Sequence, residues 1–224
     1  METQIKSLED MKKDLRNPLS GLKQGDWVKI QNKFEQIARN LFEDFAIQCG
    51  EKQFRLAEIE FYYYKKGEWN EDWNKETYPR TNKQAGELFF HYSGVDICFE
   101  SHLAKEDNIE YNPEFGGILI RSLLDGNNIL AGPSYCENIM LNACTDNLPK
   151  LVCAAHKNFN YYPTKRYNIP SDNQERMKLK LCYYAEAVDG EKLDWKKTSI
   201  RKEWDKKAER LKLVNRNYFN ERKF

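Results

Sequence analysis

Residues 55–64 read RLAEIEFYYY and have the aromatic and branched apolar content of a β-strand. Side chains alternate between the two faces of a strand, so this segment divides into two sets. One set is apolar and is predicted to face the core: Ala57, Ile59, Phe61 and Tyr63. The other set carries two carboxylates: Leu56, Glu58, Glu60 and Tyr62. The question raised by this strand is what two glutamates do on one face of so apolar a segment.

The local pattern leaves two interpretations of that face open. In the first, the face is solvated, as one face of many antiparallel sheets is. In the second, one carboxylate is a general base in a pocket. A general base must be ionised near neutral pH and lie within hydrogen-bonding reach of its water.

The composition is that of a globular protein with a single core. The chain has 224 residues, of which 40% are hydrophobic and 32% charged, and this predicts one domain with extensions. The net charge of +1 gives no strong indication of nucleic-acid binding. No apolar run approaches a membrane span and the first residues lack a signal peptide's apolar stretch, so we expect a cytoplasmic protein without membrane contact. The six cysteines form no CxxC pair and have no histidine at ligand spacing, so we expect reduced thiols, no metal and no cofactor.

The order of helical and extended patterns predicts an α+β fold, with a curved mixed or antiparallel sheet flanked by helices. Apolar residues recur every three and four positions in the expected helix 27–46, and Pro133 opens a second helix. The expected strands are 53–64, two strands within 87–101 around a turn at Ser93-Gly94, 117–124 and 178–186; the expected loops are 65–85 and 145–165. We predict a helical arm at 1–26, the α+β domain at 27–189 and a basic helix at 190–224, which either packs on the domain or contacts nucleic acid.

Several segments, taken in order, resemble the alkyladenine (3-methyladenine) DNA glycosylase family over residues 35–186. The matching segments are Ile37-Ala38-Arg39-Asn40-Leu41, Glu58-Ile59-Glu60-Phe61-Tyr62, the hairpin Gly86 to Phe99, Leu119-Ile120-Arg121-Ser122-Leu123, Gly132-Pro133-Ser134 and Arg166-Tyr167-Asn168-Ile169. Their shared order and spacing carry the resemblance. It implies the methyladenine DNA glycosylase (formyltransferase C-terminal-like) fold and, as activity, the excision of damaged bases from DNA in base excision repair.

The resemblance also implies roles for individual residues. Glu60 would activate a water that attacks the sugar C1′ and displaces the base, and Arg121 would steady that water or the developing charge. Tyr62 and Phe90 would sandwich the flipped base. From its place in the hairpin, His91 is either a pocket donor oriented by Asp96 or a solvated turn histidine.

The chain departs from the family where duplex DNA is handled. Ser93 stands where the family has a tyrosine that wedges into the vacated base stack, and a serine cannot fill that space. No histidine in residues 65–78 matches the family's pocket histidine, and Trp69 or Trp73 would line the pocket instead or anchor a surface loop. Three functions are therefore open: a DNA glycosylase, an N-glycosidase acting on single-stranded nucleic acid or nucleotides, and a non-catalytic nucleotide or nucleic-acid binding module.

Overall fold

A computed structural model describes residues 6–23, 25–65, 83–91, 93–101, 114–144, 147–166 and 179–195. The helices in these stretches are α1 (Leu8–Arg16), α2 (Trp27–Asp44) and α3 (Pro133–Asn142). The strands are β1 (Phe45–Cys49), β2 (Lys52–Lys65), β3 (Leu88–His91), β4 (Gly94–Cys98), β5 (Glu114–Asp125), β6 (Asn128–Ala131), β7 (Lys150–Cys153), β8 (Phe159–Thr164), β9 (Cys182–Val188) and β10 (Glu191–Lys192). Helices and antiparallel strands occur together, which confirms the predicted α+β class.

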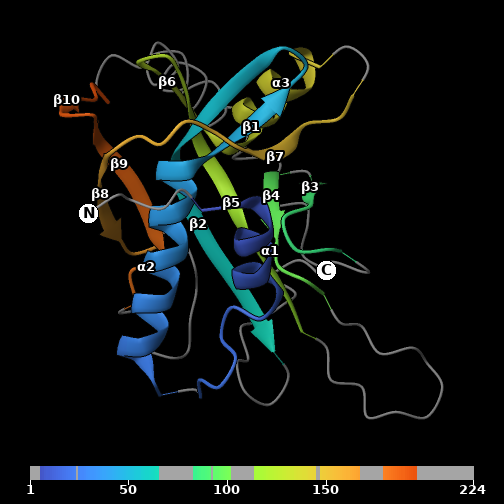
Figure 1. Cartoon of the computed structure of the whole chain (residues 1–224), viewed down its shortest axis with the longest axis vertical. Helices are drawn as coiled ribbons and strands as arrows, with labels where there is room; N and C mark the ends of the chain where they lie inside the picture. The colour runs from blue at the N-terminus through green and yellow to red at the C-terminus, as the bar shows by residue number, and fades with distance from the viewer. Residues whose placement is uncertain are drawn as a thin grey trace, which may run out of the picture.

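The strands form one strongly curled antiparallel sheet, a half-barrel, with β2 and β5 at its centre (Figure 1). The main strand order is β10-β9-β2-β5-β4-β3, and β1, β6, β7 and β8 pair beside this path. Both central strands change partner along their length: β2 pairs first with β1 and then with β9, and β5 pairs first with β4 and then with β6. The other strands of the sheet therefore pair with different parts of the long β2–β5 ribbon.

Helix α2 covers one face of this sheet and builds the core with it (Figure 1). Its Phe34 is fully buried and meets the Phe61 ring of β2 at 4.7 Å between centroids. Phe61 in turn meets Tyr183 of β9 edge-on at 5.6 Å. Burying one such aromatic side chain stabilises a fold by about 1.5–3 kcal/mol. The core side of β2 is therefore the set predicted from the sequence: Ala57, Ile59, Phe61 and Tyr63.

Helix α1 lies in the predicted N-terminal arm and packs into the same core. Its N-terminus is closed by a capping box, in which the Asp10 backbone N–H donates to Ser7 Oγ at 3.1 Å and the Ser7 N–H donates to the Asp10 carboxylate at 3.3 Å. Met11 and Leu15, one turn apart, are fully buried in the cluster that contains Phe34. These contacts tie the arm to the α+β domain.

The prediction of a loop over residues 145–165 is wrong. Strands β7 and β8 lie within it, β7 pairing with β1 and β8 with β9. Among the described residues, each of these two strands pairs along one side only. An edge strand tolerates a proline such as Pro163, and it was this proline that favoured the prediction of a loop. The expected basic helix falls mostly on residues 196–224, outside the described residues, as do Trp69 and Trp73. Among the described helices, none combines the length and apolarity that a membrane crossing requires.

Candidate functional site

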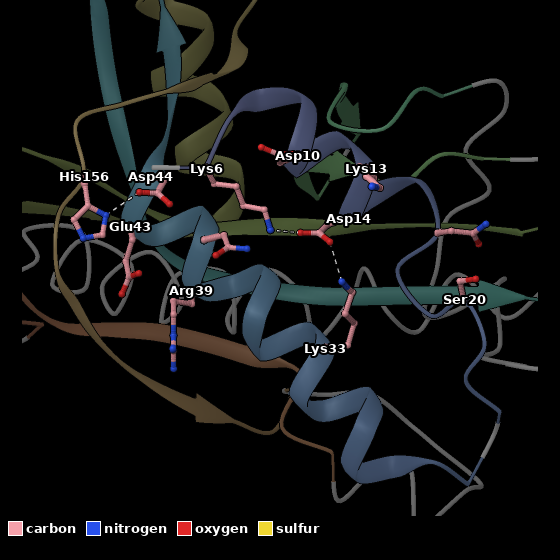
Figure 2. A pocket seen from close by; sticks show the side chains of 12 residues that line it. Lys6, Asp10, Lys13, Asp14, Ser20, Lys33, Arg39, Glu43, Asp44 and His156 are labelled. Atoms are coloured by element: carbon pink, nitrogen blue, oxygen red, sulfur yellow. Dashed lines mark hydrogen bonds and ion pairs between the residues drawn. The ribbon is translucent and has the colours of Figure 1, made fainter. Parts of the chain in front are cut away.

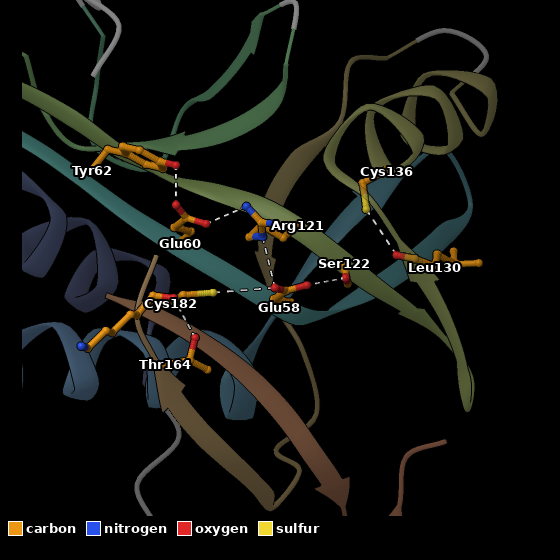
Figure 3. A network of polar contacts seen from close by, with 10 residues as sticks. Glu58, Glu60, Tyr62, Arg121, Ser122, Leu130, Cys136, Thr164 and Cys182 are labelled. Carbon is orange, nitrogen blue, oxygen red and sulfur yellow. Dashed lines mark hydrogen bonds and ion pairs between the residues drawn. The ribbon is translucent and has the colours of Figure 1, made fainter. Parts of the chain in front are cut away.

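Glu60 lies at the centre of a polar cluster on the sheet face opposite α2. Its side chain is fully buried, and both carboxylate oxygens are engaged (Figure 3). The Tyr62 hydroxyl donates to Oε1 at 2.5 Å, and Arg121 Nη1 donates to Oε2 at 2.7 Å. The two residues predicted as catalytic, Glu60 and Arg121, are thus in direct contact although 61 positions separate them.

Arg121 also binds the second glutamate of β2. Its Nε donates to Glu58 Oε1 at 3.1 Å, and Ser122 Oγ donates to Glu58 Oε2 at 3.0 Å (Figure 3). About a quarter of each of the Arg121 and Glu58 side chains is exposed, 25% for Arg121 and 23% for Glu58, against 0% for Glu60. The cluster therefore runs from an enclosed carboxylate to a solvent-accessible ion pair.

Two β-bulges place these side chains together. The β2–β5 register shifts between Leu56 and Glu58 and again between Glu58 and Ile59, so Ala57 is an extra residue on β2 and Arg121 an extra residue on β5. A bulge re-aims side chains relative to regular alternation. Arg121 and Ser122 consequently both face Glu58, although neighbours on a regular strand would face opposite sides. The same shift puts Leu56 into the core cluster, which corrects its predicted place beside the glutamates.

Burial and charge act in opposite directions on the pKa of Glu60. Burial raises this pKa above its usual 4.5, and the charge of Arg121 and the hydrogen bond from Tyr62 only partly offset the increase. Burial also raises the pKa of Tyr62, and the neighbouring Glu60 carboxylate adds to the effect. For Arg121, burial disfavours the charged guanidinium, but the carboxylates of Glu60 and Glu58 outweigh it and raise the pKa. The cluster therefore holds a permanent cation beside a carboxylate that takes up a proton more readily than usual.

Arg166 is a further member that the sequence analysis quoted but gave no role. Its guanidinium lies 5.0 Å from the centroid of the Tyr62 ring, and its Nη1 donates to the Phe61 carbonyl at 3.1 Å. Tyr62 was predicted to stack on a base. In the structure its ring contacts the Arg166 guanidinium, and its hydroxyl donates a hydrogen bond to Glu60. The only sequence signal for Arg166 was the segment match, because its partners lie more than 100 positions away.

The β3–β4 hairpin brings a second polar group to the same face. Asp96 pairs with Leu119, which pairs with Glu60, and directly paired residues of antiparallel strands share a face. His91 Nε2 lies 3.2 Å from Asp96 Oδ2, and the His91 side chain is 9% exposed. Of the two alternatives left open for His91, the contact with Asp96 is present, and the solvated turn histidine is not what the structure shows. Ser93 Oγ lies 2.9 Å from His91 Nδ1.

Phe90 does not join Tyr62. It pairs with Val95 in the β3–β4 ladder and packs against the hydrophobic core, on the face opposite Glu60. Its neighbour Phe89 pairs with Asp96 and stacks with His91 at 5.5 Å between ring centroids. Alternation along β3 therefore makes Phe89 the hairpin ring on the Glu60 face.

A cavity of about 900 Å³ lies elsewhere, between α1, α2 and the segment after β7 (Figure 2). Its charges neutralise each other: Lys6 and Lys33 both bind Asp14, and His156 Nδ1 lies 2.8 Å from Asp44 Oδ1. None of the predicted site residues lines it. Within the described stretches, no group of three or more potential metal ligands is assembled.

Comparison with known proteins gives no match to a family model and none to a curated protein. The geometry of the Glu60 cluster is therefore the basis for a functional assignment.

Proposed function

We propose that the protein hydrolyses N-glycosidic bonds of nucleic acids or nucleotides, with Glu60 as the general base. The observation that carries this proposal is an enclosed carboxylate of raised pKa, held between a tyrosine hydroxyl and a guanidinium. Strongly perturbed titratable groups with specific charged partners are typical of active sites. A base whose pKa is shifted toward the working pH transfers protons more effectively.

In the proposed reaction, Glu60 removes a proton from a water molecule as the water oxygen attacks the sugar C1′. The C1′–N bond breaks, and its electron pair leaves with the base. Arg121 fixes the Glu60 carboxylate, keeps part of the population ionised, and lies close to the charge that develops in the transition state. The resemblance to the alkyladenine DNA glycosylases supports a damaged base in DNA as the substrate, and thus a role in base excision repair.

The hairpin favours single-stranded nucleic acid or nucleotides over duplex DNA. Ser93 occupies the position at which the family has its wedge tyrosine, and its Oγ lies 2.9 Å from His91 Nδ1. A short hydroxyl side chain held in this way does not intercalate into a base stack. A base that is already unstacked needs no wedge, so such substrates fit this site better.

The experiment is a base-release assay with the wild type and Glu60→Gln. The substrates are alkylated and deaminated bases in single-stranded and duplex DNA, and the corresponding free nucleosides. Glutamine keeps the shape of the side chain but cannot accept the proton, so release should fall at least about a hundredfold.

Glu114→Gln is the matched control. Glu114 is another buried carboxylate that accepts a hydrogen bond from a tyrosine hydroxyl, here of Tyr63, but it lies at the start of β5, where its register partner is Lys65. This variant should retain release. Full activity of Glu60→Gln on a substrate that the wild type cleaves would refute the assignment of the base.

One observation favours a second function, that of a non-catalytic nucleotide or nucleic-acid binding module. Glu60 exposes no surface, and each of its oxygens already has a partner. In a binding module this cluster would only hold β2 and β5 together. Such a protein would release no base from any substrate above, yet would bind single-stranded DNA or nucleotides in a titration followed by fluorescence anisotropy.

A further inference from the structure

An aromatic surface begins one strand away from the polar cluster, on the same face of the sheet. Glu58 of β2 pairs with Tyr184 of β9, and Tyr184 pairs with Tyr162 of β8. Directly paired residues of antiparallel strands share a face. The next row along the strands agrees, because Glu60 pairs with Cys182, whose Sγ lies 3.7 Å from Glu58 Oε1 (Figure 3). The polar cluster and the two tyrosines therefore lie on one continuous surface.

The two tyrosine rings support each other and are partly uncovered. The ring centroids of Tyr162 and Tyr184 are 5.9 Å apart, with the planes inclined by 48°. Trp195 meets Tyr184 edge-on at 5.7 Å, and its Nε1 donates to the Ala185 carbonyl at 2.7 Å. Tyr162 is 50% exposed. These three rings form what we call the aromatic platform, and a half-exposed ring that its neighbours hold in place can stack with another flat ring.

Basic side chains lie at one end of the aromatic platform, where β8 finishes and β9 begins. This end pairs with the part of β2 that contains Glu60. Lys180 is exposed, and its Nζ lies 5.7 Å from the centroid of the Tyr162 ring. Lys165, directly after β8, is exposed as well, whereas the acidic Glu186 lies toward the other end of β9. Exposed aromatic rings beside cations suit a polymer with flat bases and a phosphate backbone.

We propose that the aromatic platform binds single-stranded DNA, whose bases stack on Tyr162 and Tyr184 beside the nucleotide that occupies the Glu60 site. The identity of that nucleotide rests on the proposed function, but binding to the platform needs no hydrolysis. Neighbouring strands are about 4.8 Å apart, so Tyr184 is one spacing and Tyr162 two spacings from Glu58. A DNA strand that leaves the Glu60 site across the sheet therefore meets first Tyr184 and then Tyr162. Aromatic residues on a sheet stack successive bases in this way in RNA-recognition domains.

The platform requires a single strand, because neighbouring base pairs cover the flat faces of the bases in a duplex. Stacking on aromatic side chains is available to every unpaired base and depends little on sequence. The long Lys180 side chain can move from the Tyr162 ring to a phosphate when a base takes its place. The small side chain of Ser93 at the wedge position is an independent observation that favours the same unstacked substrate.

The test is the binding of a fluorescein-labelled oligothymidylate of about twelve nucleotides, followed by fluorescence anisotropy. Tyr162→Leu keeps an apolar side chain but removes the ring, so we expect the affinity to fall at least about fivefold. Tyr162→Phe keeps the ring and should restore binding to within about twofold of the wild type. An oligomer of the same length without bases should bind more weakly, and Tyr162→Leu should not weaken its binding further.

Lys180→Gln tests the contact with phosphate. Loss of one such contact should reduce the slope of log affinity against log salt concentration by about 0.7. Lys29→Gln is the matched control, because Lys29 is also an exposed lysine but lies on α2, on the other side of the sheet, with its Nζ 3.4 Å from Asp26 Oδ1. This variant should keep the wild-type slope. An unchanged slope in Lys180→Gln would overturn the phosphate contact.

The outcomes separate the platform from the proposed hydrolysis. Equal affinities of Tyr162→Leu and Tyr162→Phe, equal binding of the oligomer without bases, or no binding by the wild type would each overturn the aromatic platform as a DNA site. Ring-dependent binding by a wild type that releases no base from any substrate would support the platform and remove the N-glycosidase function. Base release together with ring-independent binding would do the reverse.

Discussion

Two opposing effects set the pKa of Glu60, and this pKa determines at which pH the carboxylate is able to accept a proton. Enclosure disfavours the carboxylate, whereas Arg121 at 2.7 Å and Tyr62 at 2.5 Å favour it. Enclosure has the larger effect, so the pKa is raised. In water the same carboxylate would be a weaker base with an ordinary pKa. Glu58, two residues earlier and partly exposed, keeps Arg121 in place from its other side.

This balance predicts how activity depends on pH. Glu60 must be deprotonated to act as a base, so kcat/KM should rise with pH with a midpoint above 4.5, the ordinary value for glutamate. Arg121→Gln removes a charge that lowers the Glu60 pKa, so the midpoint should move to higher pH, together with a loss of rate. Rate–pH profiles on one oligonucleotide measure both. Arg39→Gln, on α2, should leave the midpoint unchanged; a midpoint that moved down in Arg121→Gln would contradict the charge argument.

At the scale of elements, the β2–β5 ribbon determines where the polar cluster around Glu60 lies. Its regular part pairs Glu60 with Leu119 and Tyr62 with Gly117. Its irregular part, around Glu58, turns Arg121 and Ser122 to one side. A regular ladder there would send one of these two side chains into the core. The bulges thus bring Arg121 and Ser122 into contact with Glu58 and complete the ion-pair cluster.

The close approach of these two strands gives a stability prediction. A Cβ on Gly116 would lie 2.3 Å from the Tyr62 carbonyl oxygen and 2.9 Å from Phe99 Cδ2. Gly116→Ala should therefore force β2 and β5 apart and lower the free energy of unfolding by about 1–3 kcal/mol. Urea denaturation measures the change.

A second glycine substitution controls for the loss of glycine itself. Gly126, in the β5–β6 turn, has φ +60°, and a Cβ added there would have no atom within 4 Å. Asparagine tolerates this left-handed conformation, so Gly126→Asn should change the free energy of unfolding by less than about 0.5 kcal/mol. If Gly116→Ala were as stable as the wild type, the strands would not approach as closely as described.

How far the sequence predicts this structure depends on the range of each interaction. Alternation along β2 and the 3.6-residue periodicity of α2 are local, and they correctly placed Phe61 and the apolar face of α2 in the core. The His91–Asp96 contact spans one turn, and the sequence offered it as one of two alternatives without deciding between them. The bulges at Ala57 and Arg121 have no local signature, because they depend on the register between strands far apart in sequence.

Two further misses follow from the same limit. The expected stacking ring was Phe90, but pairing with β4 and β5 puts Phe89 on the Glu60 face instead. A single position changes the face of a strand residue, so a residue matched by family resemblance alone is easily off by one. The edge strand β8 was missed because Pro163 and the short apolar content resemble a loop, while its pairing partner β9 follows 18 positions after β8 ends.

Considered as a whole, the molecule carries apolar packing on one face of the sheet and polar clusters on the other. The α2 side carries the aromatic packing of Phe34, Phe61 and Tyr183. The opposite side carries the Glu60 and His91 clusters. Substitutions on the polar side should therefore affect activity more than the packing of the core, and this is the condition under which the Glu60 and Arg121 variants are informative.

The His156–Asp44 pair connects the segment after β7 to the end of α2 (Figure 2). This pair makes a pH-dependent contribution to the free energy of unfolding. The hydrogen bond to Asp44 raises the pKa of His156 above its ordinary 6.5. Because the folded-state pKa lies above the unfolded one, the stabilisation is fully present below 6.5 and is lost as pH rises through the folded-state value.

His156→Gln should therefore lower the free energy of unfolding by about 0.5–1 kcal/mol at acidic pH and by almost nothing at about pH 9. Urea denaturation of wild type and variant across this range measures the difference. Asp44→Asn should reproduce the trend, because it removes the same pair from the other side. A difference between wild type and His156→Gln that stayed constant with pH would mean that the ring contributes by packing, and a difference that grew with pH would contradict the sign of the pKa shift.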